Sequence, residues 1–262
     1  MRNDEWETFH TIDKEIFEKE DHISEEFFQK HVQKPGFLAL ETIQGNLLGY
    51  LVLGQFTDEI AHLGRIGVRK SHQSQGLGTK LMKYALNWFH EKEGITEVQL
   101  YTQIDNLQAQ GLYNKHGFKI IGQTWHYFVP FDSIHAVRKY TVQIAQPEEY
   151  QMVADLFPKS LPLGAIHRFI EREQLIFTLK DPSTQIVGAT RFTPNFPGCF
   201  PFELLELTGF DDYIHAFQSL CDPPSDLLRI TFHENEQLAQ LCETRGYKLH
   251  HKLNRMQLIL PK

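Results

Sequence analysis

An internal repeat constrains the fold of this chain more than any other feature of its sequence. Residues 104–120 (IDNLQAQGLYNKHGFKI) and residues 233–249 (HENEQLAQLCETRGYKL) align without a gap. The identical pairs in this alignment are Asn106 and Asn235, Gln108 and Gln237, Leu112 and Leu241, Gly117 and Gly246, and Lys119 and Lys248. A chance similarity between two helix–glycine–strand segments would seldom include matching polar residues, so the alignment indicates a duplicated unit.

The pattern of apolar residues predicts the same order of elements around both repeats. In the first half the predicted elements are two helices within residues 4–33, three strands within 37–68, a helix from about 79 to 92, a strand at 95–103, a helix at 106–116 and two strands within 118–131. The second half repeats this order with one more strand, at residues 140–145, at its start. We therefore predict an α/β (α+β) fold in which each half forms a mixed sheet with helices on its faces.

The repeat predicts two domains, residues 1–133 and residues 140–262, joined by a linker after Pro130. A chain of 262 residues is long enough for two domains of ordinary size. Only three residues precede the first predicted helix, so either the first domain lacks the strand that opens the second or the chain starts late.

The charge balance argues against a nucleic-acid partner, because 26 basic and 33 acidic residues give a formal net charge of −7. No apolar run approaches membrane-spanning length, and the acidic N-terminus is unlike a secretory signal. We therefore expect no membrane partner and a cytoplasmic location. Ten acids lie within the first 26 residues; they form either a solvated helix face or an acidic approach for a cationic substrate.

The spacing of cysteine and histidine predicts neither a metal site nor a disulfide framework. Cys199, Cys221 and Cys242 all lie in the second half, and no two of them form a C-x-x-C pair. The chain has 14 histidines, but they include no H-E-x-x-H motif.

The two halves differ at one loop. In the first half, eleven residues (RKSHQSQGLGT) separate the strand ending at Val68 from the following helix. In the second half, LELTGF passes almost directly into DDYIHAF, with Asp211 and Asp212 at the helix start. Glycines let a backbone come close to a ligand, and a helix start offers free N–H groups, so the first loop is suited to a phosphate or pyrophosphate. The second half has lost this anion site.

Two common phosphate-binding motifs do not fit this loop. Gly76-Leu77-Gly78 is followed by Thr79-Lys80-Leu81, which lacks the third glycine or alanine of a dinucleotide fingerprint. A P-loop requires lysine directly after its last glycine, and here threonine stands between them. The pattern that fits is Q-x-x-G-x-G, residues 73–78.

This loop, followed one strand and one helix later by DNLQAQGLYNKHGF, resembles the GNAT (Gcn5-related N-acetyltransferase) superfamily. The resemblance covers residues 1–130, and a weaker, degenerate version covers about 140–262. It implies acetyl-CoA as the co-substrate, with no metal. The residues that it assigns to acetyl-CoA binding are Ile66, Gly67, Val68, Gln73, Ser74, Gln75, Gly76, Leu77, Gly78, Thr79, Asn106, Ala109 and Tyr113.

The resemblance also implies roles for individual residues. The loop would hold the pyrophosphate, the backbone of residues 66–68 would pair with the pantetheine arm, and Asn106 would contact the same arm. Tyr113 would protonate the departing thiolate; the alternative is a packed aromatic residue on an amphipathic helix. An amine acceptor must lose a proton to react, and His62 and Glu59 are the candidate bases. The alternative for His62 is a strand histidine bonded to a neighbour.

These features together predict an N-acetyltransferase that transfers an acetyl group from acetyl-CoA to a primary amine by direct attack. The acceptor would be a small-molecule amine or a peptide, and the degenerate second domain would either wall the acceptor cleft or form a homodimer face. Another acyl donor remains open, because the loop does not contact the acyl group. The alternative function is a non-catalytic acyl-CoA sensor or interaction module.

Overall fold

The computed structural model describes residues 1–261, which fold into two compact units. Unit 1 comprises Met1–Thr102, Asn106–Ile120 and the chain from Met256 onward. Unit 2 comprises Gln103–Asp105 and Ile121–Arg255. No helix within residues 1–261 is long and apolar enough to cross a bilayer.

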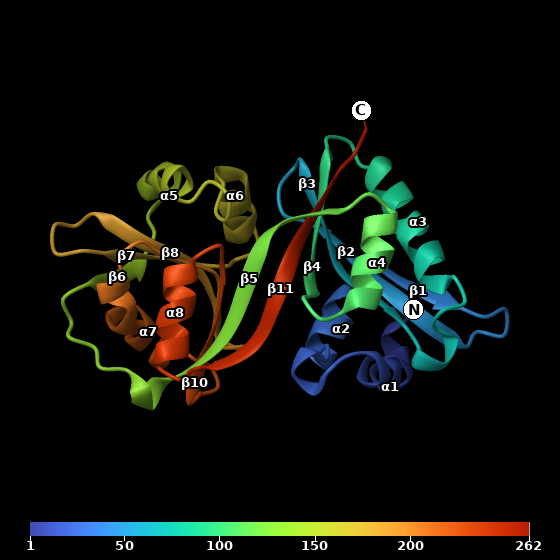
Figure 1. Cartoon of the computed structure of the whole chain (residues 1–262), viewed down its shortest axis with the longest axis horizontal. Coiled ribbons are helices and arrows are strands. Elements are labelled where there is room, and N and C mark those ends of the chain that lie inside the picture. Colours follow the sequence, from blue (N-terminus) through green and yellow to red (C-terminus); the bar gives the residue numbers. More distant parts are fainter. Residues whose placement is uncertain (262) are drawn as a thin grey trace. The chain divides into compact units, whose positions relative to one another are not determined.

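Unit 1 has the mixed α/β architecture predicted for the first half of the chain (Figure 1). Its elements are α1 (Trp6–Ile16), α2 (Glu25–His31), β1 (Phe37–Glu41), β2 (Leu47–Gln55), β3 (Ile60–Val68), α3 (Leu77–His90), β4 (Glu97–Gln103) and α4 (Leu107–Lys115). Strands β1, β2 and β3 are antiparallel neighbours, and β4 runs parallel to β3. Within residues 1–261, α1 is preceded by a short 3-10 helix (Asn3–Glu5) and by no strand.

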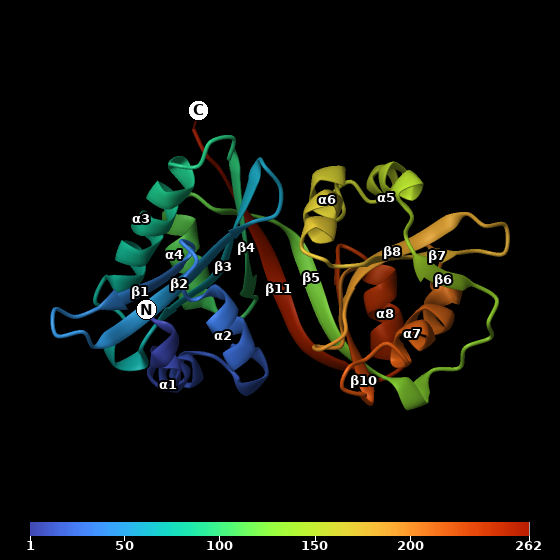
Figure 2. The same cartoon turned by 180° about the vertical axis from the view of Figure 1, so that it is seen from behind.

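The alternation of side chains along β2 divides unit 1 into two apolar layers. Leu51 and Leu53 pack with residues of α3 and α4 on one face of the sheet. Tyr50 packs on the other face with Phe9 of α1 and Phe28 of α2. Figure 2 shows these two helix pairs from the opposite side of the molecule. The predicted site lies at the edge of the sheet, between these two apolar layers.

Unit 2 repeats the element order of unit 1 with one strand added at its start, as predicted. Its elements are β6 (Thr141–Ile144), α5 (Tyr150–Leu156), α6 (Leu163–Glu171), β7 (Ile176–Lys180), β8 (Ile186–Thr193), β9 (Gly198–Leu204), α7 (Phe210–Gln218), β10 (Leu227–His233) and α8 (Glu236–Thr244). Asn106 and Asn235, which the repeat aligns, both cap a helix that follows a parallel strand, at the start of α4 and of α8.

The last strand of each repeat continues into the other unit, and here the structure differs from the predicted boundaries. β5 (Lys119–Pro130) starts in unit 1, but its residues 124–130 pair with β10 of unit 2. β11 (Lys248–Ile259) starts in unit 2, and its end lies next to β4, where Leu260 N–H donates to the Thr96 carbonyl at 2.9 Å. The compact units therefore do not coincide with residues 1–133 and 140–262, although those ranges remain the predicted limits of the two sequence copies.

The end of the first copy also differs from the prediction in strand number. The sequence predicts two strands within residues 118–131, whereas the structure has the single strand β5. The predicted boundary between these two strands falls between Trp125 and His126. In the structure both residues pair with β10, Trp125 with Phe232 and His126 with Thr231. Long-range pairing thus overrides the local signal.

Candidate acyl-CoA site

A bulge in β3 opens one edge of the unit 1 sheet. Val52 of β2 pairs with Arg65, but the next residue, Leu53, pairs with Leu63, so Gly64 is an extra residue in β3. Before the bulge, residues 60–63 pair with β4; past Leu63, no β3–β4 pair occurs within residues 1–261. Past the bulge, alternate backbone N–H and C=O groups of residues 65–68 therefore have no partner on the β4 side among the described residues. An extended ligand that carries amide groups can pair with them.

The loop after β3 is held in place at its start. The Gln73 side-chain amide donates to the Val68 carbonyl at 3.1 Å. Glu15 of α1 accepts from the Lys70 backbone N–H at 2.9 Å and from Arg69 Nε at 2.9 Å. These contacts fix the direction in which the chain leaves β3 and enters α3.

Backbone conformation explains the glycine directly before α3. Gly76 is the N-cap of this helix and has φ of +80°, and Ser74 just before it has φ of +60°. A Cβ built on Gly76 meets no described atom within 4 Å, so the left-handed conformation, and not crowding, requires glycine there. No side chain of residues 1–261 caps the helix. Its first N–H groups thus have no side-chain cap within the described residues, and such groups favour an anion.

Gly78 has a different role from Gly76. A Cβ at Gly78 would come within 3.2 Å of Leu112 Cδ2, so this glycine allows α4 to pack closely against the start of α3. Because Leu112 directly precedes Tyr113, the packing also brings the Tyr113 segment of α4 close to the loop.

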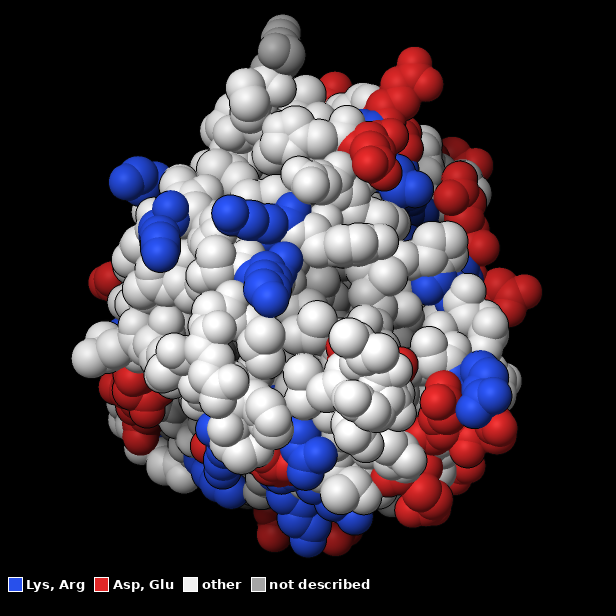
Figure 3. Space-filling view, turned by 90° about the vertical axis from the view of Figure 1, so that its right-hand side faces the viewer, with Lys and Arg blue, Asp and Glu red and all other residues white. Residues whose placement is uncertain are grey.

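The electrostatic surroundings of the loop suit a pyrophosphate. Residues 60–90 contain no aspartate or glutamate, whereas Lys70, Lys80 and Lys83 are exposed. Figure 3 views the side on which α3 lies in Figure 1 and shows basic side chains near the centre of this face, with acids mainly toward one margin. The α3 dipole adds about 0.3–1 kcal/mol for each nearby anionic group.

Tyr113 lies on α4 inside the core that α3 and α4 form with the sheet. Its side chain is 5% exposed, and its ring centre lies 6.1 Å from that of Phe118. Burial raises the pKa of Tyr113 well above its usual value. The hydroxyl is therefore protonated at neutral pH, as an acid must be, and the same burial also fits a packed aromatic residue.

Asn106 and Ala109 are joined by a local capping bond. The Asn106 Oδ1 accepts from the Ala109 backbone N–H at 3.0 Å at the start of α4. Asn235 makes the same bond to the Leu238 N–H, also at 3.0 Å, at the start of α8. Helix capping alone therefore explains why both copies have asparagine here.

The two candidate bases lie at different distances from the bulge. The His62 ring packs 4.4 Å from Phe56 and lies beside Gly64, and its Nδ1 is buried without a hydrogen-bond partner among residues 1–261. Burial lowers the pKa of His62 to about 4. Glu59 is exposed and precedes β3. At about 3.3 Å per residue, it lies about 20 Å along the strand from Ile66.

A buried charged network beside the site was not predicted from the sequence. The carboxylate of Asp13 is fully buried and accepts from Tyr50 Oη and from the Ile23 N–H at 2.8 Å. It also lies 3.5 Å from Arg65 Nη2, and the Arg65 guanidinium lies 4.0 Å from the centre of the Phe17 ring. Asp13 thus belongs to neither the solvated face nor the acidic approach proposed for the N-terminal acids.

The corresponding region of unit 2 is closed by its own hydrogen bonds. Asp212, in the first turn of α7, accepts from the backbone N–H groups of residues 138–140 at 2.7, 2.8 and 2.9 Å. Asp211 forms an ion pair with Arg245. The position of Tyr113 is taken by Cys242, which is fully buried, and burial raises the pKa of this thiol to about 12.

Comparison with known proteins gives a family match for the first part of the chain. Residues 1–118, which include the loop and α4, match the sequence model of the acetyltransferase (GNAT) family. This part of the chain is therefore similar to GNAT acetyltransferases. No protein with a curated description matches the sequence.

Solved structures extend the shared fold over the whole chain. A GCN5-related N-acetyltransferase from Sphaerobacter thermophilus is 12% identical and aligns over 99% of this chain and 94% of its own, with a TM-score of 0.74. A tandem GNAT protein from the clavulanic acid biosynthesis pathway is 12% identical over 99% of this chain and 95% of its own, with a TM-score of 0.62. A GCN5-related N-acetyltransferase from Kribbella flavida is 12% identical over 99% and 70%, with a TM-score of 0.56. At these identities the likeness shows a shared two-unit fold and no more.

Proposed function

We propose that this protein is an acetyl-CoA-dependent N-acetyltransferase that acts on a primary amine through unit 1. The observation that carries the proposal is the coincidence of two features in that unit: the uncovered β3 edge past Gly64 and the acid-free glycine loop that leads from this edge into α3. An extended pantetheine arm and a pyrophosphate are chemically matched to these two surfaces.

Acetyl-CoA supplies a thioester carbonyl; attack by the amine forms a C–N bond and breaks the C–S bond. In the proposed mechanism, backbone N–H groups of β3 past the bulge polarise this carbonyl. Tyr113 donates its hydroxyl proton to the leaving sulfur. Because the pKa of Tyr113 is raised, its hydroxyl carries this proton at neutral pH. The proton lost by the amine passes to solvent or to a nearby acceptor.

The pKa of His62 limits its proposed role. A lysine-like amine with a pKa of about 10.4 must lose a proton at a cost of about 4.6 kcal/mol at pH 7. With a pKa of about 4, His62 is neutral but takes up that proton only weakly. We therefore assign His62 the role of a hydrogen-bond acceptor or transient relay near the bulge, ahead of Glu59, and we favour acceptors that release a proton easily.

We also propose a class of acceptor and a cellular location. A small-molecule amine or a peptide end fits the mechanism, and we propose a cytoplasmic enzyme without a nucleic-acid or membrane partner. Unit 2 would support unit 1 or form a homodimer face, without binding acyl-CoA.

The alternative is a non-catalytic acyl-CoA sensor, and the tight packing of Tyr113 in the core favours it. Release of free CoA thiol from acetyl-CoA in the presence of an amine panel separates the two functions. An enzyme releases thiol in proportion to amine concentration. If acetyl-CoA binds but no amine in the panel raises thiol release above the spontaneous rate, the sensor stands.

A further inference from the structure

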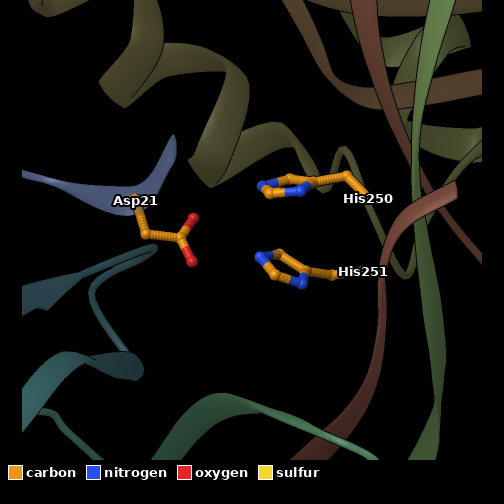
Figure 4. A group of neighbouring side chains, drawn as sticks. All are labelled: Asp21, His250 and His251. Carbon is orange, nitrogen blue, oxygen red and sulfur yellow. The ribbon is translucent and has the colours of Figure 1, made fainter. Parts of the chain in front are cut away.

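Two consecutive histidines of β11 lie on the same side of their strand. Side chains of neighbouring strand residues normally point to opposite faces. The rings of His250 and His251 instead have centres 3.7 Å apart and planes inclined by 33°. Figure 4 shows both rings extending from β11 in the same direction. A ring nitrogen of one lies within 4.8 Å of a ring nitrogen of the other.

A third imidazole comes from the neighbouring strand β5. Trp125 and Tyr127 belong to the apolar core under α7 and α8, so alternation places His126 on the opposite face of the unit 2 sheet. The His126 ring centre lies 4.9 Å from that of His250 and 6.3 Å from that of His251. Three histidines from two adjacent strands thus form one cluster within unit 2, which we call the imidazole cluster.

The spacing of the imidazole cluster is close to that of a metal site. Two imidazoles that share a tetrahedral ion, each with a nitrogen 2.0–2.1 Å from it, have ring centres about 5 Å apart. The three observed separations, 3.7, 4.9 and 6.3 Å, lie on either side of this value. Rotation of the side chains, that of His126 above all, would be needed to bring three nitrogens to one ion. Imidazole is a preferred ligand of zinc, copper and nickel.

The surroundings of the imidazole cluster favour a borderline transition metal over magnesium or calcium. The Gln103 side-chain amide nitrogen lies 3.1 Å from Nδ1 of His251. Coordination through Nε2 requires this amide to turn over, so that its oxygen accepts from the Nδ1–H. Phe128 packs 4.8 Å from His250, and Arg229 and Lys248 lie 5.6 and 5.5 Å from the Phe128 ring centre. These nearby positive charges repel a bound cation, so an ion held by electrostatic attraction alone would bind weakly. A metal ion that forms strong bonds to nitrogen is favoured instead.

We propose that His126, His250 and His251 of unit 2 form a binding site for a divalent transition-metal ion. The site is separate from the acyl-CoA loop in sequence and in chemistry, and it departs from the absence of metal expected from the sequence. Metal-binding sequence motifs do not reveal this site, because one ligand comes from β5 and the other two are consecutive residues of β11.

The test is zinc titration of the full-length protein without a histidine tag, by calorimetry at about pH 7.5. One Zn²⁺ per chain is expected to bind with a dissociation constant of about 10 μM or tighter. Co²⁺, used as a spectroscopic probe, should give the visible absorption of a four-coordinate site in which three ligands are imidazole nitrogens and the fourth is water. Absence of binding at about 100 μM free Zn²⁺ would overturn the proposal.

Two variants and one control test the ligands. His126→Ala and His250→Ala should each weaken zinc binding at least about tenfold. His215→Ala is the matched control, since His215 is an exposed histidine on α7 of the same unit, and it should leave the affinity unchanged. Far-ultraviolet circular dichroism and acetyl-CoA binding check that each variant is folded. Unchanged affinity in His126→Ala would overturn the three-ligand site even if His250→Ala lost binding.

Discussion

Asn235 donates a hydrogen bond from Nδ2 to the carbonyl oxygen of Leu204, 3.1 Å away, and so ties the start of α8 to the end of β9. Leu204 pairs with Gly188 as Val68 pairs with Gly49 in unit 1, so the two carbonyls are equivalent. In unit 1, the Val68 carbonyl accepts from Gln73 of the loop. The same carbonyl thus supports the anion loop in one copy and is bonded to the next helix in the other.

This difference predicts one acetyl-CoA site per chain. Unit 2 has neither the glycine loop nor an uncharged helix start, because Asp211 and Asp212 occupy the first turn of α7. Calorimetric titration of the full-length protein should give a stoichiometry of about one. A stoichiometry of two would show that the second copy also binds.

Substitution of Gly76 should separate backbone strain from ligand binding. Gly76→Ala places a side chain at φ of +80°, which costs about 1 kcal/mol of stability, and brings a methyl group into the proposed pyrophosphate site. We expect acetyl-CoA affinity to fall at least about tenfold, and Gly76→Glu should abolish binding. Gly45→Ala is the matched control because Gly45 has φ of +83° and equally open surroundings, but lies in the turn between β1 and β2. An equal loss of affinity in both alanine variants would contradict the loop assignment.

Tyr113→Phe tests the acid. If Tyr113 protonates the thiolate, kcat should fall about 10²-fold, with acetyl-CoA affinity nearly unchanged. Tyr84→Phe, which alters an exposed tyrosine of α3, should leave kcat unchanged. The measurement is steady-state thiol release, with calorimetry for affinity. Equal kcat in wild type and Tyr113→Phe would leave only the packing role for Tyr113.

The buried imidazole of His62 predicts a dependence of stability on pH. Its pKa is about 4 in the folded protein and about 6.5 in the unfolded chain. Between pH 4 and 6.5 the unfolded state binds more protons than the folded state. The contribution of neutral His62 to the free energy of unfolding is therefore complete above about pH 6.5 and is lost as the pH falls toward 4. The loss is about 3 kcal/mol at most.

Comparison of wild type with His62→Gln isolates this contribution. Burial also lowers the pKa of His233, to about 3, so the wild-type slope contains both groups. Urea unfolding at several pH values should show a smaller fall in stability between about pH 6.5 and 4.5 for His62→Gln than for wild type. Parallel curves for the two proteins would place the His62 pKa near its ordinary value.

Asp13→Asn should destabilise unit 1 strongly. The change leaves Arg65 beside a neutral amide and disturbs the bond from Tyr50, both in a buried setting. Removal of one partner from a buried ion pair typically costs about 3–5 kcal/mol. Glu7→Gln, an exposed acid on the same helix, should change the free energy of unfolding by less than about 0.5 kcal/mol. Similar small effects of both substitutions in urea unfolding would mean that Asp13 is solvated.

Element order and the loop could be predicted from the sequence, because both depend on local patterns. Residues 60–68 form the predicted strand, and Gly76 before α3 adopts a left-handed conformation that favours glycine. The Asp13 network could not be predicted, since Asp13 lies among nine other acids in the first 26 residues and only tertiary contacts distinguish it. The exchange of β5 and β11 could not be predicted for a similar reason: only long-range pairing decides which sheet each strand completes.

That exchange sets an order for the synthesis of the two units. Met256 and Leu260 are buried in the core with Leu81, Val98 and Leu100, so unit 1 contains residues that are made after every residue of unit 2. The earlier part of unit 1 must therefore wait for its final strand until all of unit 2 has been synthesised. A chain that stops before Met256 would carry the glycine loop on an unfinished sheet.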